Sequence, residues 1–257
     1  MTTLPGIDIS RIGQGDTFDW SPWHGRIAYA FVKATQGVNF QDVAYPHNIA
    51  AARALGIVCG SYHVLEPDVP GTAQADYYLA YASPQPGELV MVDVEITAGA
   101  NGAPVPAAKV SACVASFCDV IKHETGAWPV TYVDQSMAQA GYVASAGQCP
   151  AFIADPSHVQ LPNPIGPWRL VSFIQTGQTG VDTDTFYGDL LELQRLTTTR
   201  RYVPPAPPAP APKLPLELMA LNTGRTYAPG QPLETIWLES TDNGASYRPR
   251  TPAAAGN

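Results

Sequence analysis

Two carboxylates stand close together at the end of an apolar segment, 88–99 (ELVMVDVEITAG). Residues 89–94 are hydrophobic apart from Asp93, and Glu95 follows two positions later. Because side chains alternate across a strand, the three valines of this segment share one face, whereas Met91, Asp93 and Glu95 share the other. The rise of a strand places carboxyl groups at positions i and i+2 about 7 Å apart.

Such a pair suggests acid catalysis. In a poorly solvated cleft the two carboxyl groups do not both ionise freely, so one keeps its proton and its pKa rises. A carboxylic acid that is still protonated near neutral pH is the group that general-acid catalysis requires. The position of the pair at the end of a buried strand favours this functional interpretation over the alternative that the two acids are ordinary residues of a solvated surface.

Other aspartates occupy similar places. They lie in or just after apolar segments, at Asp8, Asp155, Asp182 and Asp184. We interpret Asp184 as a turn or helix-capping residue, since aspartate is favoured in both places. The D-x-D pair at 182 and 184 could bind a metal ion, but no histidine or third acid lies close in the sequence. We therefore expect neither a metal nor a cofactor.

The order of elements predicts a barrel. Strand-like segments such as 27–35 and 57–65 alternate with helix-like segments such as 42–56 and 106–126, the last with Gly126 at its end. This alternation is typical of parallel β-α units, and the connections shorten towards the later strands. We predict an α/β fold, an irregular β/α barrel with fewer helices than strands. No glycine-rich phosphate loop follows the first strand, which disfavours a doubly wound sheet.

The predicted barrel determines the direction in which the acidic face of this strand points. The valine face of 89–94 suits the helix layer, so the face with Asp93 and Glu95 points into the barrel near the C-terminal end of the strand. Active sites of β/α barrels lie at that end. Five aromatic residues could either line a cleft there or pack in the core: Trp20, Trp23, Tyr62, Tyr132 and Trp168.

We expect three regions in the chain. Residues 1–199 form the catalytic barrel, and 200–215 form a proline-rich linker of extended polyproline II conformation. Residues 216–257 form a small attachment or binding segment with weak strand signals at 216–221 and 234–240 and a disordered end. A segment this small buries little core by itself.

Composition excludes several classes of protein. The 257 residues include 22 acidic and 14 basic side chains, for a net charge of -8, without a basic cluster that would bind nucleic acid. No apolar stretch approaches the roughly 20 residues of a membrane span. The N-terminus lacks a secretory signal, so we expect release from the host cytoplasm through a holin or lysis, or association with a virion. The four cysteines are expected to be buried thiols.

An ordered set of motifs resembles glycoside hydrolase family 25, the lysozymes of fungi, actinobacteria and phages. The motifs are GIDIS, FVKATQG, GSYHVL, MVDVE, TYVD, FIADP and SFIQTG through VDTDTF, which together span Leu4 to Leu193. The resemblance implies an irregular β/α barrel and hydrolysis of the β-1,4 bond from N-acetylmuramic acid to N-acetylglucosamine in bacterial peptidoglycan. It also suggests a phage or actinobacterial origin.

The resemblance implies roles for single residues. It places the proton donor on Glu95 and its companion on Asp93, with further acids of the site at Asp8 and Asp182. The residues expected to contact the substrate are Tyr62, Tyr132, Gln175, Lys33 and Asp155. The chain departs from the family pattern at Gln36, where a glutamate is frequent, and at two tryptophans. These departures affect contacts with the sugars more than the acid chemistry.

Two other functions fit the same residues. The first is a catalytically weak or inactive protein that keeps the barrel and binds cell walls or forms part of a virion. The second is a glycosidase for chitin or another polysaccharide. Whatever the activity of the barrel, the C-terminal segment could contact a cell-wall polymer or phage virion proteins. The sequence also leaves open whether a second carboxylate or the substrate's own 2-acetamido group assists the reaction.

Overall fold

The computed structural model describes residues 2–155, 163–177, 180–204, 238–240 and 247–249. The chain divides into two compact units, Met1–Pro204 and Pro205–Asn257. In the second unit, β10 (Leu238–Ser240) and β11 (Tyr247–Pro249) pair as antiparallel strands. Strand β10 lies inside the segment predicted at 234–240, whereas the predicted strand at 216–221 lies outside the described residues.

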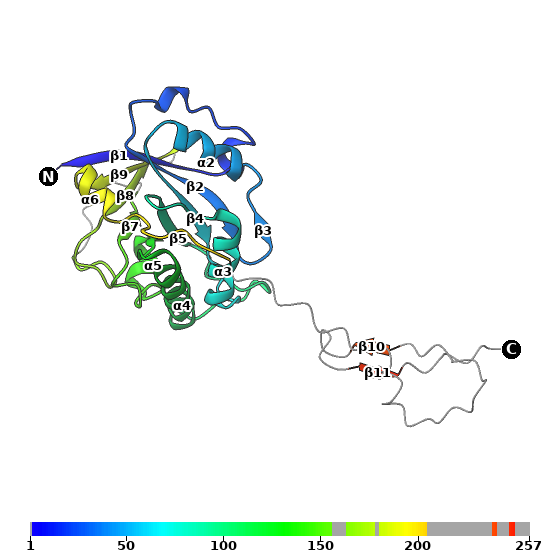
Figure 1. Ribbon diagram of the computed structural model, residues 1–257. Helices are drawn as coiled ribbons and strands as arrows, with labels where there is room; N and C mark the ends of the chain where they lie inside the picture. The colour runs from blue at the N-terminus through cyan, green and yellow to red at the C-terminus, as the bar shows by residue number, and fades with distance from the viewer. Residues whose placement is uncertain (1, 156–162, 178–179, 205–237, 241–246, 250–257) are drawn as a thin grey trace, which may run out of the picture. The chain divides into compact units, whose positions relative to one another are not determined.

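Eight strands of the first unit close into a barrel, because β1 pairs with β9 on one side and with β2 on the other (Figure 1). The strands of the barrel are β1 (Thr3–Ile9), β2 (Tyr29–Gln36), β4 (Val58–Val64), β5 (Leu89–Val94), β6 (Val130–Asp134), β7 (Ala151–Ala154), β8 (Phe173–Gly177) and β9 (Asp182–Tyr187). Neighbours from β1 through β2 and β4 to β8 are parallel, and β9 runs antiparallel to both of its neighbours. A short strand, β3 (Phe40–Gln41), pairs antiparallel with the end of β2.

The helices are distributed unevenly around this barrel. Three long ones connect successive strands from β2 to β6, namely α2 (Tyr45–Ala54), α3 (Gly71–Ala82) and α4 (Ala107–Thr125). The others are short: α1 (Arg11–Gln14), the 3-10 helix η1 (Ser21–Trp23), α5 (Gln135–Gln139) and α6 (Leu190–Gln194). The prediction of an irregular β/α barrel with fewer helices than strands is confirmed. No helix among the described residues is long and apolar enough to cross a membrane.

Alternation along the strands separates two apolar clusters. The valines of β5 pack outward with the helices, where Phe117 of α4 is fully buried. Met91 points inward and shares the barrel interior with aromatic side chains such as Phe31, Phe152 and Phe173. The predicted orientation of β5 is therefore confirmed. Helix α4 ends as predicted at Gly126, whose φ of 81° lies in the left-handed region that glycine adopts freely.

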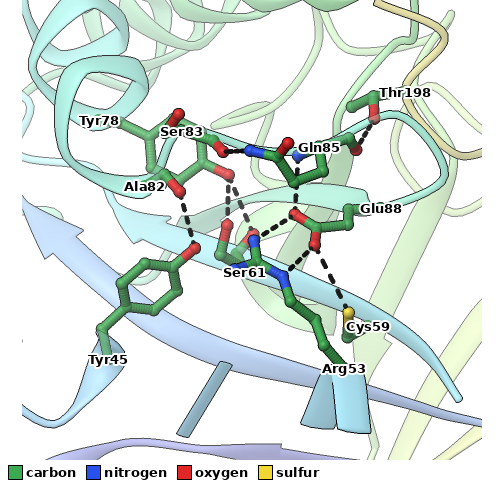
Figure 2. A network of polar contacts seen from close by, with 10 residues as sticks. All are labelled: Tyr45, Arg53, Cys59, Ser61, Tyr78, Ala82, Ser83, Gln85, Glu88 and Thr198. Carbon is green, nitrogen blue, oxygen red and sulfur yellow. Dashed lines mark hydrogen bonds and ion pairs between the residues drawn. The ribbon is translucent and has the colours of Figure 1, made fainter. Parts of the chain in front are cut away.

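A polar network surrounds Glu88, the residue before β5 (Figure 2). The Arg53 guanidinium donates to both carboxylate oxygens of Glu88, at 2.6 and 3.1 Å, and the Gln85 backbone N–H donates at 2.9 Å. Thr198 joins this network, because its N–H donates to the Glu88 carbonyl and its hydroxyl donates to the Gln85 carbonyl. The segment after α6 is thereby held against the start of β5.

The same segment continues beyond the boundary predicted at 199. The N–H groups of Thr199 and Arg200 both donate to the carbonyl of Thr125, at the end of α4. Tyr202 is buried in the cluster between barrel and helices. These contacts extend the first compact unit to Pro204. The four cysteines of this unit are free and buried, as predicted.

Candidate active site

A cavity of about 120 Å³ lies at the C-terminal end of the parallel strands. Its wall is formed by Asp8, Tyr62, Met91, Asp93, Glu95, Tyr132, Gln175 and Asp182. The structure therefore brings together seven of the nine residues named from the sequence, while Lys33 and Asp155 are not part of the wall. Among the described residues, no group of three or more His, Cys, Asp or Glu side chains is arranged to hold a metal ion.

The carboxyl pair of β5 has one buried and one exposed member. Asp93 is only 7% exposed, whereas Glu95 follows the last residue of the strand and is exposed. Oδ1 of Asp93 has no hydrogen-bond partner among the described residues. Burial, followed by the charges of Glu95 and Asp8, raises the pKa of Asp93 well above its ordinary value, and the charge of Lys33 lowers it by less. Of the two carboxyl groups, Asp93 is therefore the one whose surroundings disfavour ionisation.

A second acidic position lies across the cavity, where Asp8 of β1 pairs in register with Asp182 of β9. Burial and the charge of Asp182 raise the pKa of Asp8 to about 7, against a smaller lowering by a hydrogen bond from Gln175. The Gln175 amide donates to Asp8 Oδ2 at 3.0 Å, and the Tyr132 hydroxyl donates to Gln175 Oε1 at 2.8 Å. This chain of hydrogen bonds fixes the orientation of Asp8 through residues of β6 and β8.

Two residues predicted to contact substrate lie beside the cavity. Lys33 is buried on β2, and its ammonium group donates to Gln36 Oε1 at 3.2 Å. Because Gln36 is neutral, that partner leaves the charge of Lys33 uncompensated. Asp155 follows β7 and is buried, and its backbone N–H donates to the Gln175 carbonyl at 3.0 Å. Asp155 therefore contributes to the pairing of the strand ends behind the cavity wall.

The candidate aromatic residues fall into two groups. Tyr62 and Tyr132 line the cavity, where Tyr62 is buried and Tyr132 is partly buried. Trp20 and Trp168 belong to the cluster between barrel and helices, and Trp23 packs against that cluster. The indole N–H of Trp168 donates to two backbone carbonyls, at 2.9 and 3.1 Å. The tryptophans are therefore packing residues in this structure.

The interpretation of Asp184 as a turn or capping residue is wrong. Asp184 lies inside β9, pairs in register with Gly6 and with Gln175, and is only 3% exposed. It faces the barrel interior two residues deeper than Asp182. Burial, followed by the charges of Asp8 and Asp182, raises the pKa of Asp184 well above its ordinary value. The sequence signal that could have revealed it is the two-residue spacing from Asp182, which places both on one strand face.

Comparison with known proteins agrees with this geometry. Residues 7–175 match the family described as glycosyl hydrolases family 25. An N,O-diacetylmuramidase of Arthroderma benhamiae is 27% identical over 206 residues, covering 75% of this chain and 86% of the relative. The chain thus belongs to glycosyl hydrolases family 25 and is a peptidoglycan hydrolase of the muramidase (lysozyme) type.

Solved structures extend the comparison to the fold. The bacterial lysozyme of Streptomyces coelicolor superposes with a TM-score of 0.67 at 26% identity, covering 77% of this chain and 98% of that chain. A family 25 lysozyme of Aspergillus fumigatus gives the same TM-score of 0.67 at 23% identity, over 76% of this chain and 99% of that chain. The latter similarity concerns the fold alone.

Proposed function

We propose that the cavity hydrolyses the β-1,4 bond from N-acetylmuramic acid to N-acetylglucosamine, with Glu95 as the general acid. The observation that carries this proposal is the convergence of four carboxyl groups, from Asp8, Asp93, Glu95 and Asp182, on one small cavity. Glycoside hydrolysis requires one carboxyl group to protonate the leaving oxygen and a second group to stabilise the positive charge that develops. The pair on β5 can supply the acid and the stabilising anion.

Glu95 suits the role of acid because of its exposure. It stands just beyond the end of β5, where a glycan chain entering the cavity can reach it. A bound chain would remove water from Glu95, and loss of water favours the protonated form of a carboxyl group. The pair can supply this proton, because burial favours the neutral form of Asp93 and closely coupled carboxyl groups titrate as a unit.

Asp93 takes the complementary role. Transfer of its proton to Glu95 would leave an anion in a buried position beside the sugar whose bond breaks. The positive charge that grows on that sugar is stabilised by such an anion more strongly in the transition state than in the ground state. Where the 2-acetamido group of the substrate assists the reaction, the same carboxylate would orient that group.

Asp8 and Asp182 would act on the opposite wall, where either can position a water molecule or a sugar hydroxyl. The Tyr132 and Gln175 hydrogen bonds hold Asp8 in one orientation before substrate arrives. Such preorganisation reduces the reorganisation that the reaction requires.

The test is the identity of the newly formed chain ends. Purified peptidoglycan is digested, the new ends are reduced with borohydride, and the fragments are analysed by mass spectrometry. The proposal predicts that N-acetylmuramic acid occupies every new reducing end. Reducing ends of N-acetylglucosamine, or digestion of chitin at a rate similar to that of peptidoglycan, would contradict the assigned bond.

We further propose that the second unit attaches the enzyme to a cell-wall polymer. Every residue of the cavity wall lies before Pro204, and a proline-rich stretch follows directly. The full chain and a chain ending at Pro204 should hydrolyse soluble peptidoglycan fragments equally, because the barrel carries its own core. Only the full chain should sediment with intact cell walls. Equal sedimentation of both would contradict attachment, and loss of activity on fragments would show that the barrel requires the second unit.

A further inference from the structure

A row of three residues crosses the barrel interior directly below the cavity. The strand registers pair Gly6 of β1 with Asp184 of β9 on one side and with Tyr29 of β2 on the other. The same registers place Asp8 two residues nearer the cavity on β1, opposite Asp182. Asp184 and Tyr29 are therefore neighbours across a glycine, one level beneath Asp8.

Gly6 allows these two side chains to approach each other. A Cβ atom at Gly6 would lie only 2.3 Å from the outer carbons of the Tyr29 ring. The Tyr29 ring thus lies across Gly6, with its hydroxyl end toward Asp184. Burial first, and then the proximity of Asp184 and of Asp8, raises the pKa of the Tyr29 hydroxyl well above its ordinary value.

The polar atoms of this row have no partner among the residues that the structure describes. Both carboxyl oxygens of Asp184 and the hydroxyl of Tyr29 are buried without a hydrogen bond to any of them. Asp184 is 3% exposed and Tyr29 is fully buried. Buried polar groups without a protein partner are commonly satisfied by an internal water molecule that makes two to four hydrogen bonds.

We propose that Asp184 is a positioning residue for Asp8: as a neutral carboxylic acid it shares a buried water molecule with the Tyr29 hydroxyl, and this water donates a hydrogen bond to Asp8. The inference rests on the proposed catalytic use of Asp8. In this arrangement Asp184 and Tyr29 each donate one hydrogen to the water oxygen, and the water donates one of its own to the Asp8 carboxylate.

The neutral state of Asp184 follows from its surroundings. An ionised carboxylate without hydrogen bonds in an apolar interior is strongly unfavourable, so such groups keep their protons. The pKa of Asp184 is accordingly raised well above its ordinary value, by burial first and then by Asp8 and Asp182. The floor below Asp184 is aromatic, formed by residues such as Phe173 and Phe186, and supplies no charge.

The role of the water is to favour the ionised form of Asp8. Titratable groups that face Asp8 are Asp182 and Asp184 of β9, Tyr29 of β2, Tyr62 of β4, Asp93 and Glu95 at the end of β5, and Tyr132 of β6. All of these are acids or phenols; the cation on the neighbouring strand, Lys33 of β2, donates to Gln36, and its charge acts on Asp93. A hydrogen bond donated from below, like that from Gln175, therefore lowers the pKa of Asp8.

The experiment follows the titration of Asp8 directly, by the carboxyl ¹³C shift of labelled aspartate in the full chain. Tyr29→Phe and Asp184→Leu each remove one partner of the water, and we expect the midpoint of Asp8 to rise by on the order of one pH unit. Asp184→Asn keeps a neutral, hydrogen-bonding side chain and should leave the midpoint in place. Thr131→Val, on the outward face of β6, is the matched control and should also leave it unchanged.

Two results would overturn the proposal. A fall in the midpoint in Asp184→Asn would show that Asp184 is ionised, since the variant then removes a negative charge. An unchanged midpoint in Tyr29→Phe, which conserves the shape of the ring, would show that no hydrogen bond reaches Asp8 from below. The readout does not depend on activity. If the midpoint moves as expected and the pH profile of hydrolysis does not, the catalytic use of Asp8 is wrong and the positioning role stands.

Discussion

Replacement of Asp8 by asparagine should stabilise the protein at alkaline pH and should have little effect near pH 4. Burial and the charge of Asp182 raise the pKa of Asp8 from 3.8 to about 7 in the folded protein. The folded protein therefore binds this proton more tightly than the unfolded chain, and ionisation of Asp8 lowers stability as the pH rises from about 4 to about 7. Asparagine keeps an oxygen that can accept from Gln175 and does not ionise.

The size of the effect follows from the same pKa values. A difference of about 3 pH units corresponds to roughly 4 kcal/mol at 1.36 kcal/mol per unit. Water reaches the half-buried Asp8 side chain at the cavity wall and screens part of this free-energy difference. We therefore expect Asp8→Asn to gain about 2 kcal/mol at pH 8, which is roughly 4–8 °C in Tm for a unit of this size.

The assay is thermal unfolding of the wild type and Asp8→Asn at about pH 4 and about pH 8. The control is Asp76→Asn, which removes an exposed carboxyl group on α3 and should show no pH-dependent difference from the wild type. Asp8→Asn should also lose most of its hydrolytic activity. Melting temperatures that coincide with the wild type at both pH values, or a lower value for the variant at pH 8, would refute the assignment of an energetically unfavourable charge to Asp8.

Three further predictions concern the frame of the barrel. Burial lowers the pKa of His63 to about 4, so the free energy of unfolding should fall by roughly 3 kcal/mol as the pH drops from about 6.5 to about 4. In urea titrations, the free energy of unfolding of His63→Gln should depend less steeply on pH than that of the wild type. Glu88→Gln leaves the partly exposed Arg53 without its anion and should destabilise by about 2 kcal/mol in the same assay at pH 7. Gly6→Ala places a Cβ atom 2.3 Å from the Tyr29 ring and should destabilise by about 1–3 kcal/mol; a wild-type melting curve would contradict that close approach.

Local patterns in the sequence determine much of the site. Strict alternation in 89–94 is sufficient to assign the valines to the helix layer and Asp93 to the interior, because a strand offers only two faces. A long helix that ends at Gly126 is equally local, since it depends on periodicity and on a glycine in the left-handed region.

Other features depend on tertiary contacts that no local pattern contains. Strand β5 ends at Val94, so Glu95 is exposed and Asp93 is the carboxyl group that loses its water. Asp184 lies in a segment whose composition is typical of turns, and only pairing with β1 and β8 on both sides places it inside the barrel. Tyr202 stands next to a proline-rich stretch, and its burial in the first unit follows from packing rather than composition.

The most direct test of the account is the rate at which Glu95→Gln releases soluble fragments from purified peptidoglycan. Glutamine conserves the shape of the side chain but has no carboxylic proton to donate. Because general acids contribute about 10²–10⁴-fold, we predict a loss of at least about 100-fold. The melting curve should be unchanged, since Glu95 is exposed. The control Asp119→Asn changes an exposed carboxyl group on α4 and should keep the wild-type rate. Hydrolysis by Glu95→Gln at a rate near that of the wild type would contradict the assignment of Glu95 as the acid.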